Sequence, residues 1–313
     1  MSYLRGLSRD HSITLVTFEK PEDWADNAAM MRARADCAAY GIEWYPQRFR
    51  KSPRLIAPAW GQLVMGAVTL RLVQSKKVKL IHARSYMPAV IAWAIWKLTR
   101  TPFIFDMRAL WPEELVTAGR LRRGSLLHRT IQRTERICLR DAAGVVSLTE
   151  AAVGYLKESY PRELLGKNIT VIPTCADLNR FTPSVEPPEN FVYGCVGTVL
   201  SGWFKVDWLS AFFRAVARRD PNSRFEVITR DDADAVRLRL DPTDKLSKLS
   251  ILASPPQEVH KAVQRQNASA MFYAGGEVSE LGRSPTRMAE ILGCGNPVVT
   301  NEGVGDVAGI VRR

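Results

Sequence analysis

The sequence predicts an α/β fold of two Rossmann-like domains that face a cleft. Short apolar runs rich in β-branched residues alternate with longer amphipathic stretches, an order typical of a doubly wound parallel sheet. The alternation restarts after residues 177–190, a polar segment with three prolines that is typical of a linker. The length of 313 residues also favours two domains, at ~100–200 residues each. We therefore expect one domain over residues 1–183 and a second over residues 184–313.

The first half of the chain is expected to supply most of the strands. Each expected strand is a short apolar run bounded by turn signals or by an amphipathic stretch. These runs lie at 12–18, 41–45, 78–82, 102–105, 144–148 and 169–173. The stretches between them predict helices near 23–38, 57–75, 87–99, 125–140 and 149–158.

The second half repeats the pattern and then stops. Strands are expected at 191–196, 225–229, 249–252, 270–273 and 297–300, with a helix at 207–218. Ligands of such sheets bind beyond the carboxyl ends of the strands. The chain begins with a helix-like segment directly before a strand, and its last residues open another helix. From this we expect that a first strand and a C-terminal part of the two domains are missing from this sequence.

The positive charge lies almost entirely in the first part of the chain. The net charge is +12; residues 1–187 hold 28 basic and 17 acidic side chains, whereas residues 188–313 hold 16 and 15. A basic region favours an anionic partner, so nucleic acid, anionic lipid headgroups and phosphorylated substrates all remain candidates. Eight Trp, eleven Phe and eight Tyr residues exclude a disordered chain. The five cysteines are scattered without a CxxC pair, which predicts reduced thiols in a cytosolic protein and no metal site.

One apolar stretch, residues 55–73, is marginal as a membrane span because it contains a proline, two glycines and an arginine. A buried or interfacial helix fits it better. Basic residues precede it, and a second basic region follows later in the chain; these are Arg48, Arg50, Lys51 and Arg54, and then Arg120, Arg122, Arg123, Arg129, Arg133, Arg136 and Arg140. A basic face beside an apolar stretch suits an anionic membrane surface, and a solvated basic face beside a buried helix is the alternative.

The segment from Ser284 to Val299 is the most informative about a binding site. Ser284 is expected to cap a helix with Pro285 at its first position, and the free amide groups of that first turn favour a phosphate. Thr286 and Arg287 lie in the same turn, where a cation is unfavourable unless an anion binds there. Glu290, one turn later, accepts hydrogen bonds when ionised and suits a pair of ribose hydroxyls. An ordinary capped helix with a solvated arginine is the alternative.

This run resembles the donor-site helix of the family 4 glycosyltransferases, which have the GT-B fold. That family carries Glu-Ala-x-Ala-x-Gly-x-Pro-Val-Val, to which residues 290–299, EILGCGNPVV, are similar. The family often has another Glu eight positions earlier, where this sequence has Gly282; Glu277 and Glu280 are near but out of register. Residues 301–307 resemble the loop after the helix, and residues 171–183 resemble the family's exit from its first domain.

Further runs agree with the resemblance. Residues 191–203 resemble the strand and glycine loop that open the family's second domain, so Gly197 and Thr198 are expected to let the backbone approach a diphosphate. Lys205 follows closely and is expected to neutralise leaving-group charge; a solvated lysine at a helix start is the alternative.

The loops after two first-half strands, residues 81–86 and 105–114, resemble the acceptor-side loops of a family subset. His82, Asp106 and Arg108 are therefore expected, with Arg84, to orient an acceptor hydroxyl and phosphates. A purely structural histidine is the alternative at His82.

The resemblance implies transfer of a sugar, with retention, from a nucleotide-diphosphate sugar to a glycan or lipid-linked acceptor, in cell-surface polysaccharide or glycolipid biosynthesis. It implies no cofactor and no metal, a cytoplasmic enzyme that is peripheral on the inner membrane face, and no nucleic-acid partner. The alternative is a catalytically inactive basic α/β protein that binds a polyanion or an anionic membrane surface. A nucleotide-sugar epimerase fits less well because of the loops at 171–183 and 284–300. A nicotinamide dehydrogenase is disfavoured because no GxGxxG opens a βαβ unit.

Overall fold

The computed structural model describes residues 2–50, 52–53, 57–184 and 190–312. The basic residues Lys51 and Arg54, the start of the apolar stretch at Leu55 and two linker prolines, Pro187 and Pro188, lie outside the described residues. The chain divides into two compact units, one of Met1–Asp106 with Asp141–Ala143 and one of Met107–Arg140 with Gly144–Arg313. The expected boundary near residue 183 stays a prediction.

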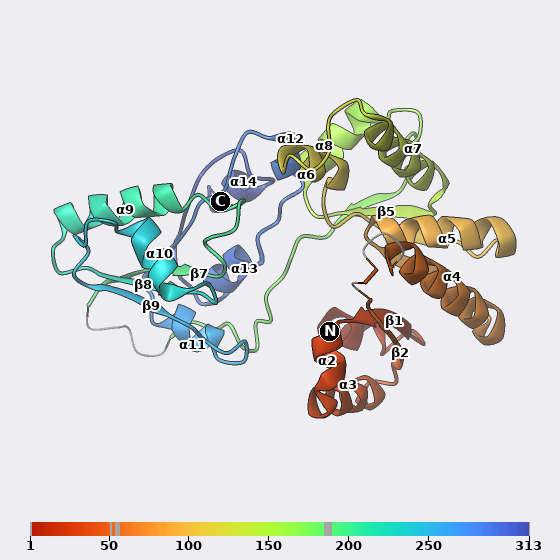
Figure 1. Ribbon diagram of the computed structural model, residues 1–313, viewed down its shortest axis with the longest axis horizontal. Helices are drawn as coiled ribbons and strands as arrows, with labels where there is room; N and C mark the ends of the chain where they lie inside the picture. Colours follow the sequence, from red (N-terminus) through yellow and green to blue (C-terminus); the bar gives the residue numbers. More distant parts are fainter. Residues whose placement is uncertain (1, 51, 54–56, 185–189, 313) are drawn as a thin grey trace. The chain divides into compact units, whose positions relative to one another are not determined.

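The first unit alternates strands and helices (Figure 1). Its elements are α1 (Ser2–Leu7), β1 (Thr14–Glu19), α2 (Pro21–Ala25), α3 (Asn27–Ala39), β2 (Glu43–Arg48), α4 (Ala57–Lys76), β3 (Ile81–Arg84), α5 (Tyr86–Thr99) and β4 (Phe103–Asp106). Strands β1 and β2 pair in parallel with Thr14 opposite Glu43, and β3 and β4 pair in parallel with Ile81 opposite Phe103. Helix α5 buries Ala89, Ala92 and Ile95, and the rings of Phe103 and Phe105 are fully buried.

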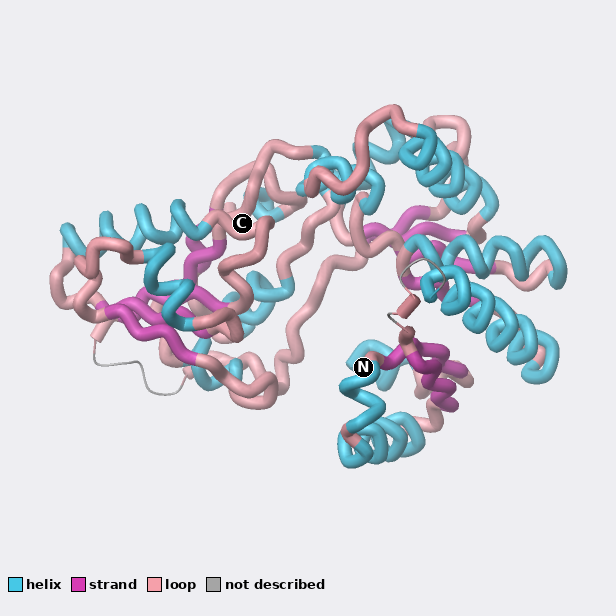
Figure 2. Tube along the Cα trace, in the orientation of Figure 1, coloured by secondary structure: helices cyan, strands magenta, loops and turns pink. Residues whose placement is uncertain are grey.

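The second unit begins with helices and two paired strands. These are α6 (Trp111–Thr117), α7 (Leu126–Asp141), β5 (Gly144–Ser147), α8 (Glu150–Ser159) and β6 (Ile169–Val171). Strands β5 and β6 are parallel, with Val145 opposite Ile169. The rest of the unit alternates strands and helices around one five-stranded sheet (Figure 2). Its elements are β7 (Val192–Val196), α9 (Val206–Arg219), β8 (Arg224–Ile228), α10 (Ala233–Leu240), β9 (Leu249–Leu252), α11 (Val259–Gln264), β10 (Ala268–Met271), α12 (Val278–Leu281), α13 (Thr286–Gly293), β11 (Val298–Thr300) and α14 (Val307–Val311).

This five-stranded sheet has the order β11-β10-β7-β8-β9, and its neighbouring strands are parallel. Helices α9 and α10 cover one face, where Leu209, Phe213 and Leu240 are fully buried in a cluster. Helices α11 and α13 supply Val263 and Ile291 to a second cluster. Burial on both faces explains why these strands read as continuous apolar runs rather than alternating ones.

The predicted α/β class with parallel strands is confirmed, and the observed strands lie within a few residues of the expected ones. The helix expected near 23–38 is two helices, because Asp26 ends α2 and its side chain accepts a hydrogen bond from the Ala29 amide at the start of α3. The short helices α6, α10, α11 and α12 were not expected. In the described part of the chain, no helix is both long enough and apolar enough to cross a membrane.

Candidate functional site

The topology of the five-stranded sheet marks one place for a ligand. From β7 the chain winds outward through β8 and β9, and then returns to β10 on the other side of β7. The order therefore reverses between β7 and β10, and open α/β sheets bind ligands at such a switch point, beyond the carboxyl ends of the strands. Gly197 follows β7 directly, and residues 272–274 follow β10.

The loop after β7 is held in a conformation that few residues adopt. Gly197 has φ +99°, and its amide donates to the carbonyl of Ile228 over 2.8 Å. The amides of Val199 and Leu200 both donate to one carboxylate oxygen of Asp231, over 2.7 and 3.0 Å. Asp231 follows strand β8, so two neighbouring strand ends fix the loop between them.

Gly197 also leaves space that Arg287 fills. A Cβ atom at Gly197 would lie 2.6 Å from Nη2 of Arg287, which is closer than any side chain tolerates. Nη2 of Arg287 donates to the carbonyl of Thr198 over 3.2 Å. The guanidinium therefore lies directly on the backbone of the glycine loop.

Aromatic rings hold the Arg287 guanidinium. Its central carbon lies 5.2 Å from the ring centre of Phe204 and 5.6 Å from that of Tyr273, within the range of cation–π attraction. Its Nη1 is buried and has no hydrogen-bond partner among the described residues. A buried donor without a partner is costly, so this position favours an anion that accepts from Nη1.

A second arginine nearby is neutralised. Arg283 donates to both oxygens of Glu280 over 2.5 and 2.9 Å, and Glu280 is fully buried. The guanidinium of Arg283 lies 5.0 Å from the ring centre of Trp203 and 5.4 Å from that of Tyr273. The carboxylate of Glu280 is thus committed to an internal ion pair.

The structure also explains the glycine at position 282. A Cβ atom at Gly282 would lie 3.0 Å from the amide nitrogen of Leu110 and 3.2 Å from its side chain. Residue 282 ends α12 where that helix packs against α6. A glutamate at this position would crowd Leu110, the N-cap residue of α6, so that Leu110 would have to shift. Glu277 is exposed.

The start of α13 differs from the expectation. The helix begins at Thr286 with Pro285 as its N-cap and no side-chain cap. Ser284 is not the N-cap, because its hydroxyl accepts from the Thr174 amide over 3.1 Å and its carbonyl accepts from the Thr174 hydroxyl over 2.6 Å. The prediction of a Ser284 cap with Pro285 at the first helical position was wrong. Without a side-chain cap, the amides of the first turn are left for a ligand.

Glu290 and Lys205 lie close to this helix and loop. Glu290 is half-buried, and burial raises the pKa of its carboxyl, while Arg287 and Arg180 act against that shift. Lys205 is exposed and forms the N-cap of α9, where its amide donates to the carbonyl of Phe272 over 2.9 Å. Lys205 is thereby anchored at the carboxyl end of β10.

The candidate residues of the first unit form a separate pair. Nε2 of His82 lies 3.1 Å from Oδ2 of Asp106. The His82 side chain is 40% exposed and that of Asp106 is 8% exposed, while Oδ1 of Asp106 is buried and has no hydrogen-bond partner among the described residues. Asp106 is the last residue of β4, whereas His82 is the second residue of β3 and not part of the loop after it, and the histidine is partly open to solvent. Arg108 belongs to the second unit and is partly buried.

Comparison with known proteins identifies the family. Residues 1–175 match the family of the glycosyl transferase 4-like domain. The chain belongs to this family. No curated protein matches it.

Solved structures of the GT-B fold resemble most of the chain. HepE of Anabaena, in complex with UDP and glucose, is 15% identical with a TM-score of 0.63, over 97% of this chain and 84% of HepE. The lipopolysaccharide outer core galactosyltransferase WaaB is 12% identical with a TM-score of 0.59, over 96% of this chain and 83% of WaaB. Sucrose-phosphate synthase of Thermosynechococcus elongatus is 12% identical with a TM-score of 0.59, over 94% of this chain and 82% of the synthase. These structures confirm the predicted fold.

In this glycosyltransferase, sequence reasoning found Arg287, Gly197 and Thr198, which the fold brings together. It missed Asp231 and the rings of Phe204 and Tyr273, which hold the glycine loop and Arg287, and it missed Thr174, which bonds to Ser284. Asp231 had a usable signal, because it is a polar residue just after the strand that ends at Ile228. The rings had none, because their role depends on the approach of two loops 69 positions apart in the sequence, seen in the bridge between Phe204 and Tyr273.

Proposed function

We propose that this glycosyltransferase moves a sugar from a nucleoside diphosphate sugar to a glycan or lipid-linked acceptor, with retention of anomeric configuration. The observation that carries the proposal is the Arg287 guanidinium, held by two rings on the glycine loop with a buried, unpartnered Nη1. We place the enzyme in cell-surface polysaccharide or glycolipid biosynthesis, in the cytoplasm at the inner membrane face. The UDP and glucose in the HepE complex support a nucleotide-sugar donor.

The chemistry requires stabilisation of the departing diphosphate. Negative charge grows on its oxygens as the bond to the sugar breaks, and donors already aimed at that place lower the barrier without reorganisation. Arg287 and the first-turn amides at Thr286 supply such donors, and the backbone at Gly197 and Thr198 allows close approach. Lys205 adds a mobile positive charge at the same edge of the sheet. Glu290 accepts from the ribose hydroxyls of the donor.

The acceptor side uses the His82 and Asp106 pair. An imidazole that hydrogen-bonds a buried carboxylate is held in one orientation and one tautomer. Such a histidine can position an acceptor hydroxyl, and the Asp106 carboxylate offsets the charge it gains on taking a proton. Arg108 binds and orients phosphate groups of the acceptor. The donor chemistry needs no metal or other cofactor in this proposal.

An inactive binding protein is the second candidate. It is favoured by one observation: the position of the family's earlier Glu holds Gly282, and the nearest buried carboxylate, Glu280, is neutralised by Arg283. Such a protein would bind a polyanion or an anionic membrane without turning over a donor. Its binding to polyanions would then weaken steeply with salt.

A nucleotide panel separates the two. Thermal unfolding is measured with UDP, GDP, ADP and CMP, because a ligand at 100 times its Kd stabilises the native state by about 2.7 kcal/mol. The matching sugar nucleotide is then tested for hydrolysis, and the anomeric configuration of a transferred product is read by NMR. We expect one diphosphate to stabilise the protein, its sugar to be cleaved, and the configuration to be retained. Absence of nucleotide binding, together with salt-dependent polyanion binding, supports the inactive protein instead.

A further inference from the structure

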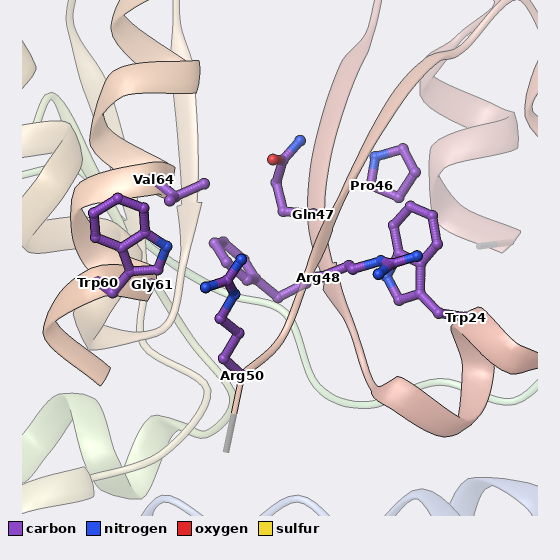
Figure 3. Close-up of a pocket in the computed structure, with 9 residues that line it drawn as sticks. Trp24, Pro46, Gln47, Arg48, Arg50, Trp60, Gly61 and Val64 are labelled. Atoms are coloured by element: carbon purple, nitrogen blue, oxygen red, sulfur yellow. The ribbon is translucent and has the colours of Figure 1, made fainter. Parts of the chain in front are cut away.

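The first unit contains a cavity that the donor chemistry does not use. Its volume is about 320 Å³, within the ~300–1,000 Å³ of small-molecule sites. It lies at the carboxyl ends of β1 and β2, against α2 and the beginning of α4, and Figure 3 shows its lining.

Two contacts connect helix α4 with the β1–β2 pair, one near each end of the helix. Near the carboxyl end of the helix, Nζ of Lys76 lies 2.8 Å from a carboxylate oxygen of Glu43, the first residue of β2. Near its amino end, Gly61 packs against Phe18, to whose ring a Cβ atom there would come within 3.9 Å. The helix therefore runs antiparallel to the strand, and its first turns face the strand ends.

Aromatic faces and cations line the cavity together. The guanidinium of Arg48 lies 4.9 Å from the ring centre of Trp24, and the side chain of Arg50 lies between Trp24 and Trp60 in the view of Figure 3. Gln47 adds an amide, and Trp60 is 49% exposed, so one ring is open to a ligand. This set combines flat apolar surface with charged and neutral hydrogen-bond donors.

Two further observations point to a ligand. Nε1 of Trp24 is buried and has no hydrogen-bond partner in the described part of the chain, and a buried indole N–H ordinarily has one. The described residues that line the cavity include Arg48 and Arg50 but no acidic residue. Its charge is therefore unbalanced within its own walls, and arginines recognise phosphate and carboxylate groups in two-pronged fashion.

We propose that this cavity binds the anionic sugar of the acceptor, a pyranose that carries a phosphate or a carboxylate. The ring lies against Trp60, the anionic group pairs with Arg50 and Arg48, and a sugar oxygen accepts from Nε1 of Trp24. A neutral sugar leaves the arginines unpaired, and a purely apolar ligand leaves all the polar groups unpaired, so neither fits as well. The assignment of the sugar as acceptor rests on the proposed function.

Calorimetric titration tests the inference with glucose 1-phosphate, glucuronate and glucose. We expect the two anionic sugars to bind at least tenfold more tightly than glucose. Arg50→Ala should weaken glucose 1-phosphate at least tenfold, whereas Arg71→Ala, which removes the same charge from an exposed site on α4 outside the cavity, should change Kd less than twofold. Trp60→Ala should weaken all sugars, and Leu63→Ala, which removes an exposed apolar side chain one turn further on, should not.

Two controls separate this inference from the donor chemistry. Nucleotide binding should be unchanged in Arg50→Ala. Loss of sugar binding with intact nucleotide binding then shows that the sugar binds in the cavity and not at the donor site. Wild-type protein that binds and cleaves a sugar nucleotide but binds the anionic sugars no better than glucose overturns the inference and leaves the proposed function standing. Binding of the anionic sugars without any nucleotide binding supports the cavity assignment and contradicts the proposed function.

The source of the anionic group is resolved by a third comparison. Free glucose 1-phosphate competes with phosphatidylcholine vesicles that contain polyprenyl phosphate if both present the same group to Arg50. Vesicle binding that Arg50→Ala abolishes indicates a lipid-linked acceptor, and free-sugar binding alone indicates a soluble glycan end. Tighter binding of UMP than of glucose 1-phosphate, lost in Arg50→Ala, would identify a nucleotide site and contradict the proposal.

Discussion

Two arginines of one short segment lie against the same tyrosine ring and differ in what balances their charge. Arg283 lies 5.4 Å and Arg287 lies 5.6 Å from the ring centre of Tyr273. Arg283 is held by both oxygens of the buried Glu280. Arg287 is held by a backbone carbonyl and a second ring, with one buried nitrogen unpartnered among the described residues.

The difference separates a structural cation from a binding cation. A neutralised arginine ties α12 to the loops around it and has little left to offer a ligand. An arginine positioned by aromatic faces and a backbone carbonyl keeps a donor for an arriving anion. The same packing surface thus supports the fold at one position and presents charge at the other. Substitutions at the two positions should therefore have opposite consequences for stability and for activity.

The largest effect is expected from Glu280→Ala. Removing one partner of a buried ion pair leaves the other charge uncompensated, which costs about 3–5 kcal/mol of unfolding free energy. Urea denaturation measures this loss. Glu302→Ala is the matched control, because Glu302 pairs with Arg312 where both side chains are more than 70% exposed, and such pairs contribute about 0–1 kcal/mol. Equal losses in the two variants would show that the Glu280 pair is not structural.

Arg287→Ala should reduce activity and leave stability nearly unchanged. We expect kcat/KM for sugar transfer to fall about 10²–10³-fold, the cost of removing one preorganised donor from a developing anion, while the unfolding free energy changes little. Steady-state kinetics and urea denaturation give the two values. Arg218→Ala is the control; Arg218 is exposed in the last turn of α9, away from the carboxyl ends of the strands. A stability loss without a kinetic one would place Arg287 with Arg283 as structural.

Gly197→Ala sharpens the account of how Arg287 is placed. The new Cβ would lie 2.6 Å from Nη2 of Arg287 at φ +99°, so the arginine must shift, and the backbone costs about 1–2 kcal/mol. We expect nucleotide affinity to fall about tenfold or more. Gly202→Ala is the matched control in the same loop, since a Cβ there meets nothing within 4 Å. Nucleotide titration of both variants measures the two affinities. Equal affinities would mean that the placement of Arg287 does not depend on this glycine.

The smallest effect concerns the pH dependence of stability. The pKa of the Glu290 carboxyl is raised in the folded state, by burial, above its usual 4.5. The protonated form is therefore favoured by folding; its contribution is full below pH 4.5 and is lost as the pH rises through the raised pKa. Wild-type protein should lose stability relative to Glu290→Gln as the pH rises. Removing Arg287, which acts against the shift, should steepen that difference.

Urea denaturation from about pH 4 to about pH 7 measures this trend. A pH-independent difference between wild type and Glu290→Gln would contradict the burial of the carboxyl. An unchanged trend in Arg287→Ala would show that the two side chains do not interact.

Much of this fold was predictable, because its strands and helices follow local patterns of apolar and polar residues in the sequence. Apolar runs of four to six residues mark parallel strands that are buried on both faces, and β9 was expected at its observed bounds. The glycine loop and Arg287 were also visible, as strand-end and helix-start residues. What failed was the cap at Ser284, because the hydroxyl of that residue bonds to Thr174, which is 110 positions away.

The parts that were not predictable depend on distant contacts. The pairing of Glu280 with Arg283, three residues apart, is equally compatible with an exposed surface pair. It is buried because α12 packs against α6 and α8, which are distant in the sequence. The absence of a glutamate at Gly282 looked like a lost functional group, and the structure shows a steric reason in Leu110. Neither fact follows from composition or periodicity.

The central claim is that Arg287 binds the terminal phosphate group of the donor nucleotide. It is tested most directly by calorimetric titration of wild type and Arg287→Ala with a nucleoside diphosphate and the monophosphate of the same base. We predict that wild type binds the diphosphate at least tenfold more tightly and that Arg287→Ala removes this preference while leaving monophosphate affinity within twofold. A preference that persists in Arg287→Ala, or an equal loss for both nucleotides, would contradict the claim.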